Sequence, residues 1–117
     1  MNKVYYLSTC DTCKRIMKDV GMESNFEKQD IKVQPLSELQ IDALFEVVGS
    51  YEALINKRAR KFKGAVLENP IAEDKDYRKL LTMDYTFLKR PVFVLDGKVF
   101  AGNAKKTVEE VREVLRG

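Results

Sequence analysis

Residues 3–20 read KVYYLSTCDTCKRIMKDV, and this stretch decides the fold. Its opening at 3–8 is rich in β-branched and aromatic side chains, which predicts a short strand. From 12 to 20 the apolar side chains recur at helical spacing, which predicts a helix. The two cysteines of the chain, Cys10 and Cys13, therefore fall where a strand ends and a helix begins.

Further elements follow this strand–helix unit. Residues 25–31 (NFEKQDI) alternate weakly and predict a second strand, which a right-handed β-α-β crossover makes parallel to the first. A helix is predicted to open at Ser37, which together with Gln40 fits a capping box. A short helix is expected at 51–56 and another at 74–88. The apolar stripe expected for the helix after Ser37 is Leu39, Leu44, Val47 and Val48.

The last part of the chain predicts a hairpin and a helix. Strands are expected at 92–95 (VFVL) and 98–101 (KVFA), joined by an Asp-Gly turn signal. Thr107 and Glu110 fit a second capping box, which is expected to open the final helix. The apolar positions of that helix are Val108, Val111, Val114 and Leu115.

The order β-α-β, helical insertion, β-β-α is that of the thioredoxin fold with extra helices between its halves. We therefore predict an α/β protein with a thioredoxin-like fold and a mixed four-stranded sheet. The length of 117 residues fits one domain, 1–117, with the helical insertion at about 35–88.

Composition limits the functions open to the chain. With 44% hydrophobic and 33% charged residues, it can bury a core and still dissolve, and no stretch reaches the roughly 18 apolar residues of a membrane span. The N-terminus turns polar too early for a signal peptide, so we expect a cytoplasmic protein, with a monomer as the default. A net charge of +3 is too small to indicate direct nucleic-acid binding.

The chain contains no histidine. This excludes Ser-His-Asp and Cys-His catalysis and nearly every metal site built on imidazole. We expect neither a bound metal nor a bound organic cofactor, so any chemistry should begin at the cysteines.

The position of Cys10 favours a reactive thiolate. A residue at the start of a helix lies against unpaired backbone N–H groups and the positive end of the helix dipole, and both favour thiolate over thiol. Such sites can lower a cysteine pKa from about 8.5 to roughly 3.5–7.5. Cys13, three residues on, lies on the same face and can close a disulfide onto Cys10. We predict Cys10 as the nucleophile and Cys13 as the resolving thiol.

Three other interpretations of the cysteine pair remain open. The first is half of a zinc site, but the chain has no second cysteine pair and no histidine to complete it. The second is a pair of buried cysteines with a structural role and no reactivity. A static disulfide is disfavoured in a chain without export signals.

Arg90 and Pro91 stand where a thioredoxin fold places the residue facing the catalytic cysteine and the proline that opens the third strand. We predict a cis peptide bond between them. The Arg90 guanidinium there would stabilise a thiolate or bind an oxyanion through two parallel hydrogen bonds, the alternative being a surface arginine beside a strand. A second basic feature, the run 57–63 (KRARKFK), is either a solvated face or a segment that binds an anion, an acidic protein patch or, as the weakest alternative, nucleic acid.

Taken together, several segments resemble the arsenate reductase ArsC/Spx family. They are LSTCDTCKRI, ALINKRARKFK, FLKRPVFVLDGKVFAGN and the closing amphipathic helix, in that order and across essentially the whole chain. The resemblance implies a thioredoxin-like core with a helical insertion, and Cys10 as the residue that attacks an oxyanion. It also implies that Arg90 and Arg58 bind the anion. An external thiol (glutathione, glutaredoxin or thioredoxin) would then complete the reduction.

Two main functions follow from this resemblance, and a third, a glutaredoxin-like electron carrier, differs from the first mainly in its substrate. The first is an arsenate-reductase-like thiol-disulfide oxidoreductase acting on a small oxyanion or a disulfide. The alternative is an Spx-like redox-sensing transcriptional regulator that binds RNA polymerase and uses Cys10 and Cys13 as a disulfide switch. Two departures favour the Spx-like and the uncharacterised branches of the family: residues 99–103 (VFAGN) hold no arginine where glutathione-linked arsenate reductases usually carry one, and Cys13 is present where they commonly lack a second cysteine.

Overall fold

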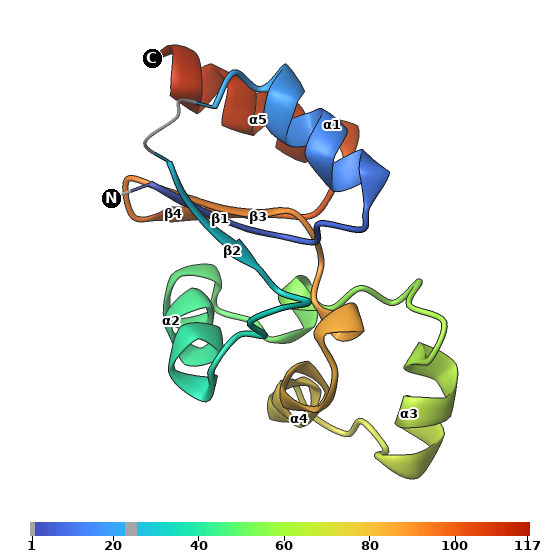
Figure 1. The fold of residues 1–117 in the computed structure, drawn as a ribbon. Helices are drawn as coiled ribbons and strands as arrows, with labels where there is room; N and C mark the ends of the chain where they lie inside the picture. Colours follow the sequence, from blue (N-terminus) through green and yellow to red (C-terminus); the bar gives the residue numbers. More distant parts are fainter. Residues whose placement is uncertain (1, 23–25) are drawn as a thin grey trace. The chain divides into compact units, whose positions relative to one another are not determined.

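The computed structural model describes residues 2–22 and 26–117. The chain forms two compact units: a core unit of Met1–Gln34 with Arg90–Gly117, and an inserted unit of Pro35–Lys89. Figure 1 shows the elements of both units. Among the described residues, none of the helices is both long enough and apolar enough to cross a membrane.

The core unit contains a mixed four-stranded sheet, as predicted. Strands β1 (Lys3–Tyr6) and β2 (Glu27–Asp30) are parallel, with Tyr6 opposite Asp30. Strand β3 (Val92–Leu95) runs antiparallel to β1 and to β4 (Lys98–Ala101), which gives the order β2-β1-β3-β4. The second strand is shorter than predicted, and Asn25, at the start of the predicted range, lies outside the described residues.

Helices α1 (Asp11–Asp19) and α5 (Lys105–Arg116) lie on the same side of this sheet (Figure 1). Each helix turns an apolar stripe toward the strands, so one hydrophobic core lies between sheet and helices. The buried members of that core are Val4, Ile16, Val20, Phe26, Phe93, Leu95 and Val111.

Phe93 is a fully buried member of this core, and we expect its truncation to destabilise the protein strongly. It is 1% exposed and meets Phe26 edge to face, with ring centroids 6.2 Å apart. Phe93→Ala should lower the free energy of unfolding by about 3–5 kcal/mol because it leaves a cavity. Urea unfolding measures this effect. The matched control is Val33→Ala, since Val33 is 81% exposed in the same unit and should change stability by less than about 0.5 kcal/mol. Equal shifts in the two variants would contradict the assignment of the core.

The inserted unit is helical. Its elements are α2 (Glu38–Val48), the 3₁₀ turn η1 (Glu52–Leu54), α3 (Phe62–Glu68), α4 (Lys75–Met83) and the 3₁₀ turn η2 (Tyr85–Phe87). The capping box predicted for the first helix is present, and the predicted helix at 51–56 is the shorter η1. The predicted helix at 74–88 is divided into α4 and η2 because the chain is extended at Asp84.

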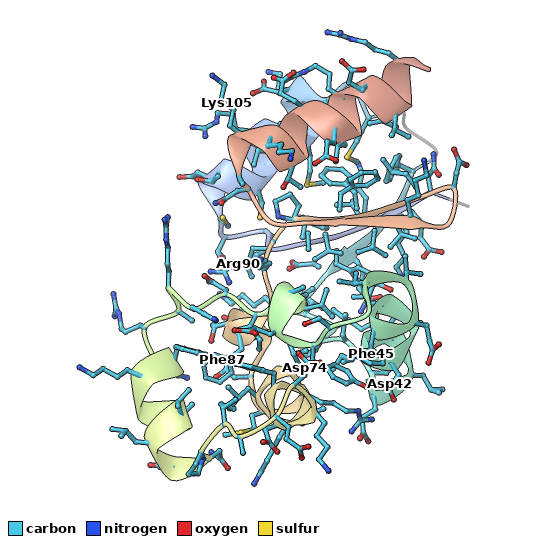
Figure 2. The ribbon with its side chains drawn as sticks, turned by 180° about the vertical axis from the view of Figure 1, so that it is seen from behind. Asp42, Phe45, Asp74, Phe87, Arg90 and Lys105 are labelled. Carbon is cyan, nitrogen blue, oxygen red and sulfur yellow. The ribbon has the colours of Figure 1, made fainter. Side chains whose placement is uncertain are left out.

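Polar side chains join α2 and α4 within this unit. The Arg78 guanidinium donates to both carboxylate oxygens of Asp42, at 2.8 and 2.9 Å, and the Tyr51 hydroxyl donates to Asp42 at 2.8 Å. Tyr51 also stacks on Phe45, with ring centroids 4.1 Å apart. The backbone N–H of Tyr51 donates to the carboxylate of Asp74. Figure 2 labels Asp42, Phe45 and Asp74.

Three details of the predicted elements were wrong. Leu39 and Val47 are 83% and 51% exposed, because the buried face of α2 is formed by Ile41 and Leu44. The last helix begins at Lys105, not at a Thr107 capping box, and its N-cap Ala104 offers no side-chain hydrogen bond. Helix α3 was not predicted at all. Its apolar residues Phe62, Ala65 and Val66 recur at helical spacing, but this stripe is short, only half-buried and interrupted by Gly64, a residue that disfavours helix interiors.

Candidate functional site

Cys10 occupies the N-cap of α1. Its backbone is extended (φ −102°, ψ 108°), and its N–H donates to the Leu7 carbonyl at 3.0 Å, closing a tight turn between β1 and α1. The Cys13 backbone N–H donates to the Cys10 Sγ at 3.4 Å. The sulfur thus serves as the capping acceptor that a serine or aspartate oxygen usually provides at this position.

This environment favours the thiolate of Cys10. Burial, the largest single effect, acts to raise its pKa, but several groups together outweigh it and the pKa is lowered from 9.0. These groups are the backbone N–H and the thiol of Cys13, the positive charge of Arg90 and the backbone of Thr12. Donors and positive charge favour the ionised form of a thiol, and Cys10 is partly exposed to solvent.

Cys13 has the opposite character. Its side chain is fully buried, and this burial is the main reason that its pKa is raised to about 12. Its hydrogen bond to Cys10 and the negative charge of Cys10 raise the pKa further, against smaller effects of the Leu7 backbone and Arg90. The pair therefore consists of an accessible thiol that ionises easily and a buried thiol that stays protonated at neutral pH. Both cysteines are reduced in the structure.

Arg90 is the third member of the site. It precedes β3, and the peptide bond to the buried Pro91 is cis. The Gly102 N–H donates to the Pro91 carbonyl at 2.9 Å, which ties this corner to the residue after β4. Figure 2 shows the Arg90 side chain where the chain enters the sheet, and its charge acts on both sulfurs.

Replacing Arg90 should make Cys10 less acidic. We expect Arg90→Gln to move the midpoint of Cys10 alkylation to higher pH, since removal of a nearby positive charge disfavours the thiolate. The measurement is the rate of iodoacetamide modification against pH. Arg90→Lys is the matched control and should retain most of the effect because it keeps the charge. A midpoint that does not move in Arg90→Gln would contradict the role of the guanidinium.

Arg58 lies in the inserted unit, on an exposed turn before α3. Its backbone N–H donates to the Asn56 side chain at 3.1 Å. Two lysines of the basic run 57–63 are paired inside this unit, Lys57 with Glu52 and Lys61 with Asp84. The structure thus brings Cys10, Cys13 and Arg90 together in the core unit, while Arg58 belongs to the other unit and its anion-binding role stays a prediction.

Sequence reasoning missed one residue near this site. Asp30, at the end of β2, accepts a hydrogen bond from the backbone N–H of Ser8 in the turn that leads to Cys10. The sequence feature that could have indicated its role was an aspartate near the end of the predicted second strand, which runs parallel to the first. Within residues 2–22 and 26–117, no three His, Cys, Asp or Glu side chains gather as metal ligands would.

Comparison with solved structures finds relatives of the same architecture. An arsenate reductase (ArsC) related protein from Brucella melitensis is 26% identical, with a TM-score of 0.66 over 93% of this chain and 92% of its own. A Staphylococcus aureus protein solved in solution is 24% identical, with a TM-score of 0.70 over 94% and 97%. An arsenate reductase from Vibrio cholerae is 14% identical, with a TM-score of 0.74 over 97% and 96%. No curated protein sequence matches the chain.

Fold and cysteine pair define the class: a thioredoxin-like α/β protein with its CxxC motif at the start of the first helix. The sequence model of the ArsC family matches residues 5–111. The chain belongs to the ArsC family, and the predicted fold class and family are both confirmed.

Proposed function

We propose that the protein is a thiol-dependent reductase of the arsenate-reductase kind, with Cys10 as nucleophile and Cys13 as resolving thiol. The observation that carries this proposal is the asymmetry of the pair: Cys10 caps α1 with a lowered pKa, and Cys13 is buried against it with a raised pKa. Membership of the ArsC family and the likeness to an ArsC-related protein support the reaction class.

The proposed first half-reaction uses Cys10 and Arg90. The Cys10 thiolate attacks the arsenic of arsenate, a hydroxide leaves as water after taking up a proton, and a sulfur–arsenic bond forms. Arg90 binds and partly neutralises the oxyanion through its planar guanidinium. Arg58 is proposed as a second anion-binding residue, on the strength of the family resemblance.

In the second half-reaction a thiol attacks the Cys10 sulfur. Its electron pair forms the new S–S bond, the sulfur–arsenic bond breaks, and arsenic(V) leaves reduced by two electrons as arsenite. We propose Cys13 for this role, which gives a Cys10–Cys13 disulfide. Glutathione, glutaredoxin or thioredoxin would then reduce that disulfide, and no bound cofactor takes part.

A single-turnover experiment tests the proposal. The fully reduced protein is mixed with arsenate between about pH 5 and pH 9, and thiol loss is followed with time. The proposal expects disulfide formation driven by arsenate, with an apparent pKa below 9.0 that belongs to Cys10. No thiol loss above a control without arsenate would remove arsenate as the substrate.

A second candidate is an Spx-like redox switch that binds RNA polymerase. The hydrogen-bonded Cys10 and Cys13 favour it, because such a pair can close a disulfide with no substrate bound. If peroxide closes the bond while arsenate leaves the thiols intact, this switch becomes the better function. Stronger capture of a polymerase subunit by the oxidised protein than by Cys10→Ser would then support it.

A further inference from the structure

The turn that delivers Cys10 to α1 is only four residues long. It runs from Leu7 to Cys10, closed by the hydrogen bond from the Cys10 N–H to the Leu7 carbonyl, so Ser8 and Thr9 occupy its centre. Its position decides where the Cys10 sulfur lies, because the sulfur must remain 3.4 Å from the Cys13 N–H to receive that hydrogen bond. Movement of the turn would carry the sulfur away from its donors.

Asp30 holds this turn from the neighbouring strand. It ends β2 directly opposite Tyr6, the last residue of β1. Its carboxylate accepts the backbone N–H of Ser8 at 3.2 Å, and the Ser8 side chain also contributes to lowering the pKa of Asp30. It also accepts the backbone N–H of Lys32 at 3.2 Å, which fixes the carboxylate within its own turn.

The groups around Asp30 favour the ionised form of its carboxylate. The Ser8 side chain is the main reason that the pKa of Asp30 is lowered from 3.8, with the N–H groups of Ser8 and Lys32 and the positive charge of Lys32 adding to it against burial. Hydrogen bonds from neutral donors to a carboxylate are stronger than those to a neutral acceptor. The bridge from Asp30 to Ser8 is therefore present throughout the neutral range.

We propose that Asp30 is a positioning residue for Cys10: by holding Ser8, it keeps the reactive sulfur on the N–H groups of α1 and close to Arg90. This inference rests on the proposed function only in taking Cys10 as the nucleophile. Asp30 itself contacts neither sulfur by any hydrogen bond of the structure.

The charge of Asp30 and its proposed positioning role predict opposite changes in the pKa of Cys10 when Asp30 is removed. The direction of that change therefore distinguishes the two. A carboxylate acting on Cys10 by its negative charge alone would disfavour the thiolate, so removing it would lower the pKa of Cys10. A carboxylate that positions the turn has the reverse effect, because its removal loosens the donors and raises the pKa of Cys10. A residue that served stability alone would leave that pKa unchanged.

The test is the pH dependence of Cys10 alkylation by iodoacetamide, with the modified cysteine identified by peptide mass. We expect Asp30→Ala to move the midpoint upward and to slow alkylation about three- to tenfold at pH values below the wild-type midpoint. That range is the effect of weakening one hydrogen bond to a charged group. Asp30→Asn should stay closer to wild type than to Asp30→Ala, since its amide oxygen can still accept the Ser8 N–H.

Two further variants complete the experiment. Asp76→Ala is the matched control: Asp76 accepts the N–H groups of Ala72 and Glu73 at 2.9 and 2.8 Å in the inserted unit, and its loss should leave the Cys10 midpoint in place. Ser8→Ala removes only the hydroxyl and should give a smaller upward shift, which tests the proposal even if Asp30→Ala fails to fold. A midpoint that falls or stays fixed in folded Asp30→Ala, or in Ser8→Ala if Asp30→Ala does not fold, overturns the proposal.

Alkylation also separates this inference from the proposed function. It needs no arsenate and no reductant, so a chain that fails to reduce arsenate can still show the shift. Conversely, arsenate-driven thiol loss combined with an unchanged midpoint in Asp30→Ala would leave the reductase standing and remove Asp30 from it.

Discussion

Cys10→Ser should abolish arsenate-driven thiol loss and leave no turnover above the uncatalysed rate. A serine hydroxyl is scarcely ionised at neutral pH and is a much weaker nucleophile than a thiolate. The helix N-terminus and Arg90 would still surround the oxygen, so the binding environment remains while the attacking atom is lost. The measurement is single-turnover thiol loss together with steady-state reduction in the presence of an external thiol.

Cys13→Ser is the matched control for this loss, because it keeps Cys10 and changes the neighbouring cysteine in the same way. Circular dichroism and urea unfolding establish that both variants fold. Arsenate reduction that persists in folded Cys10→Ser would place the nucleophile elsewhere and would falsify the mechanism.

The second large effect is expected from Cys13→Ser. The first half-reaction should proceed and then stop, so Cys10 should accumulate as a covalent adduct, for instance a mixed disulfide when glutathione disulfide is the probe. The wild-type chain should release the same adduct as a Cys10–Cys13 disulfide. Mass spectrometry of the intact protein distinguishes one bound adduct per chain from an internal disulfide. Rapid loss of the adduct from Cys13→Ser without added thiol would show that Cys13 does not resolve it.

The raised pKa of Cys13 gives this step a defined order. Burial is its main cause, but the hydrogen bond to Cys10 and the negative charge of Cys10 contribute. Once Cys10 has reacted, its charge is gone, and the pKa of Cys13 should fall from about 12 toward the value that burial alone sets. Cys13 therefore becomes a better nucleophile only after Cys10 has formed its adduct. In the wild-type chain, disulfide closure should accelerate as pH rises, since the attacking species is the Cys13 thiolate.

How much of this architecture could be predicted depends on how local the signals were. The hairpin was predicted to the residue, because an Asp-Gly turn between two β-branched strands is determined by neighbours: Asp96 and Gly97 both have positive φ, at 49° and 81°. The capping box at Ser37 was equally local. Helix α3 escaped prediction because its apolar stripe, Phe62, Ala65 and Val66, spans little more than one turn and is interrupted by Gly64, and the start of α5 was misplaced because Ala104 provides no side-chain signal.

The features of the candidate site likewise divide into those that local sequence determines and those that depend on tertiary contacts. The position of Cys10 at a helix start followed from the pattern of 3–20, whereas the full burial of Cys13 depends on side chains distant in the sequence. The bridge from Asp30 to Ser8 joins residues 22 positions apart and arises only from the pairing of β1 with β2. Strand pairing is a tertiary property, so such a contact cannot be predicted from either segment alone.

The unequal exposure of the two cysteines also makes the unmodified chain suitable for spectroscopy. A maleimide dye or nitroxide applied briefly at neutral pH should attach to Cys10 and spare Cys13, so one probe is introduced without removing any cysteine. A second probe on a cysteine introduced at the exposed Leu67 of α3 would report the distance between the core and inserted units in solution. The reactivity of Cys10 thus allows a distance measurement that would define how the two units are arranged.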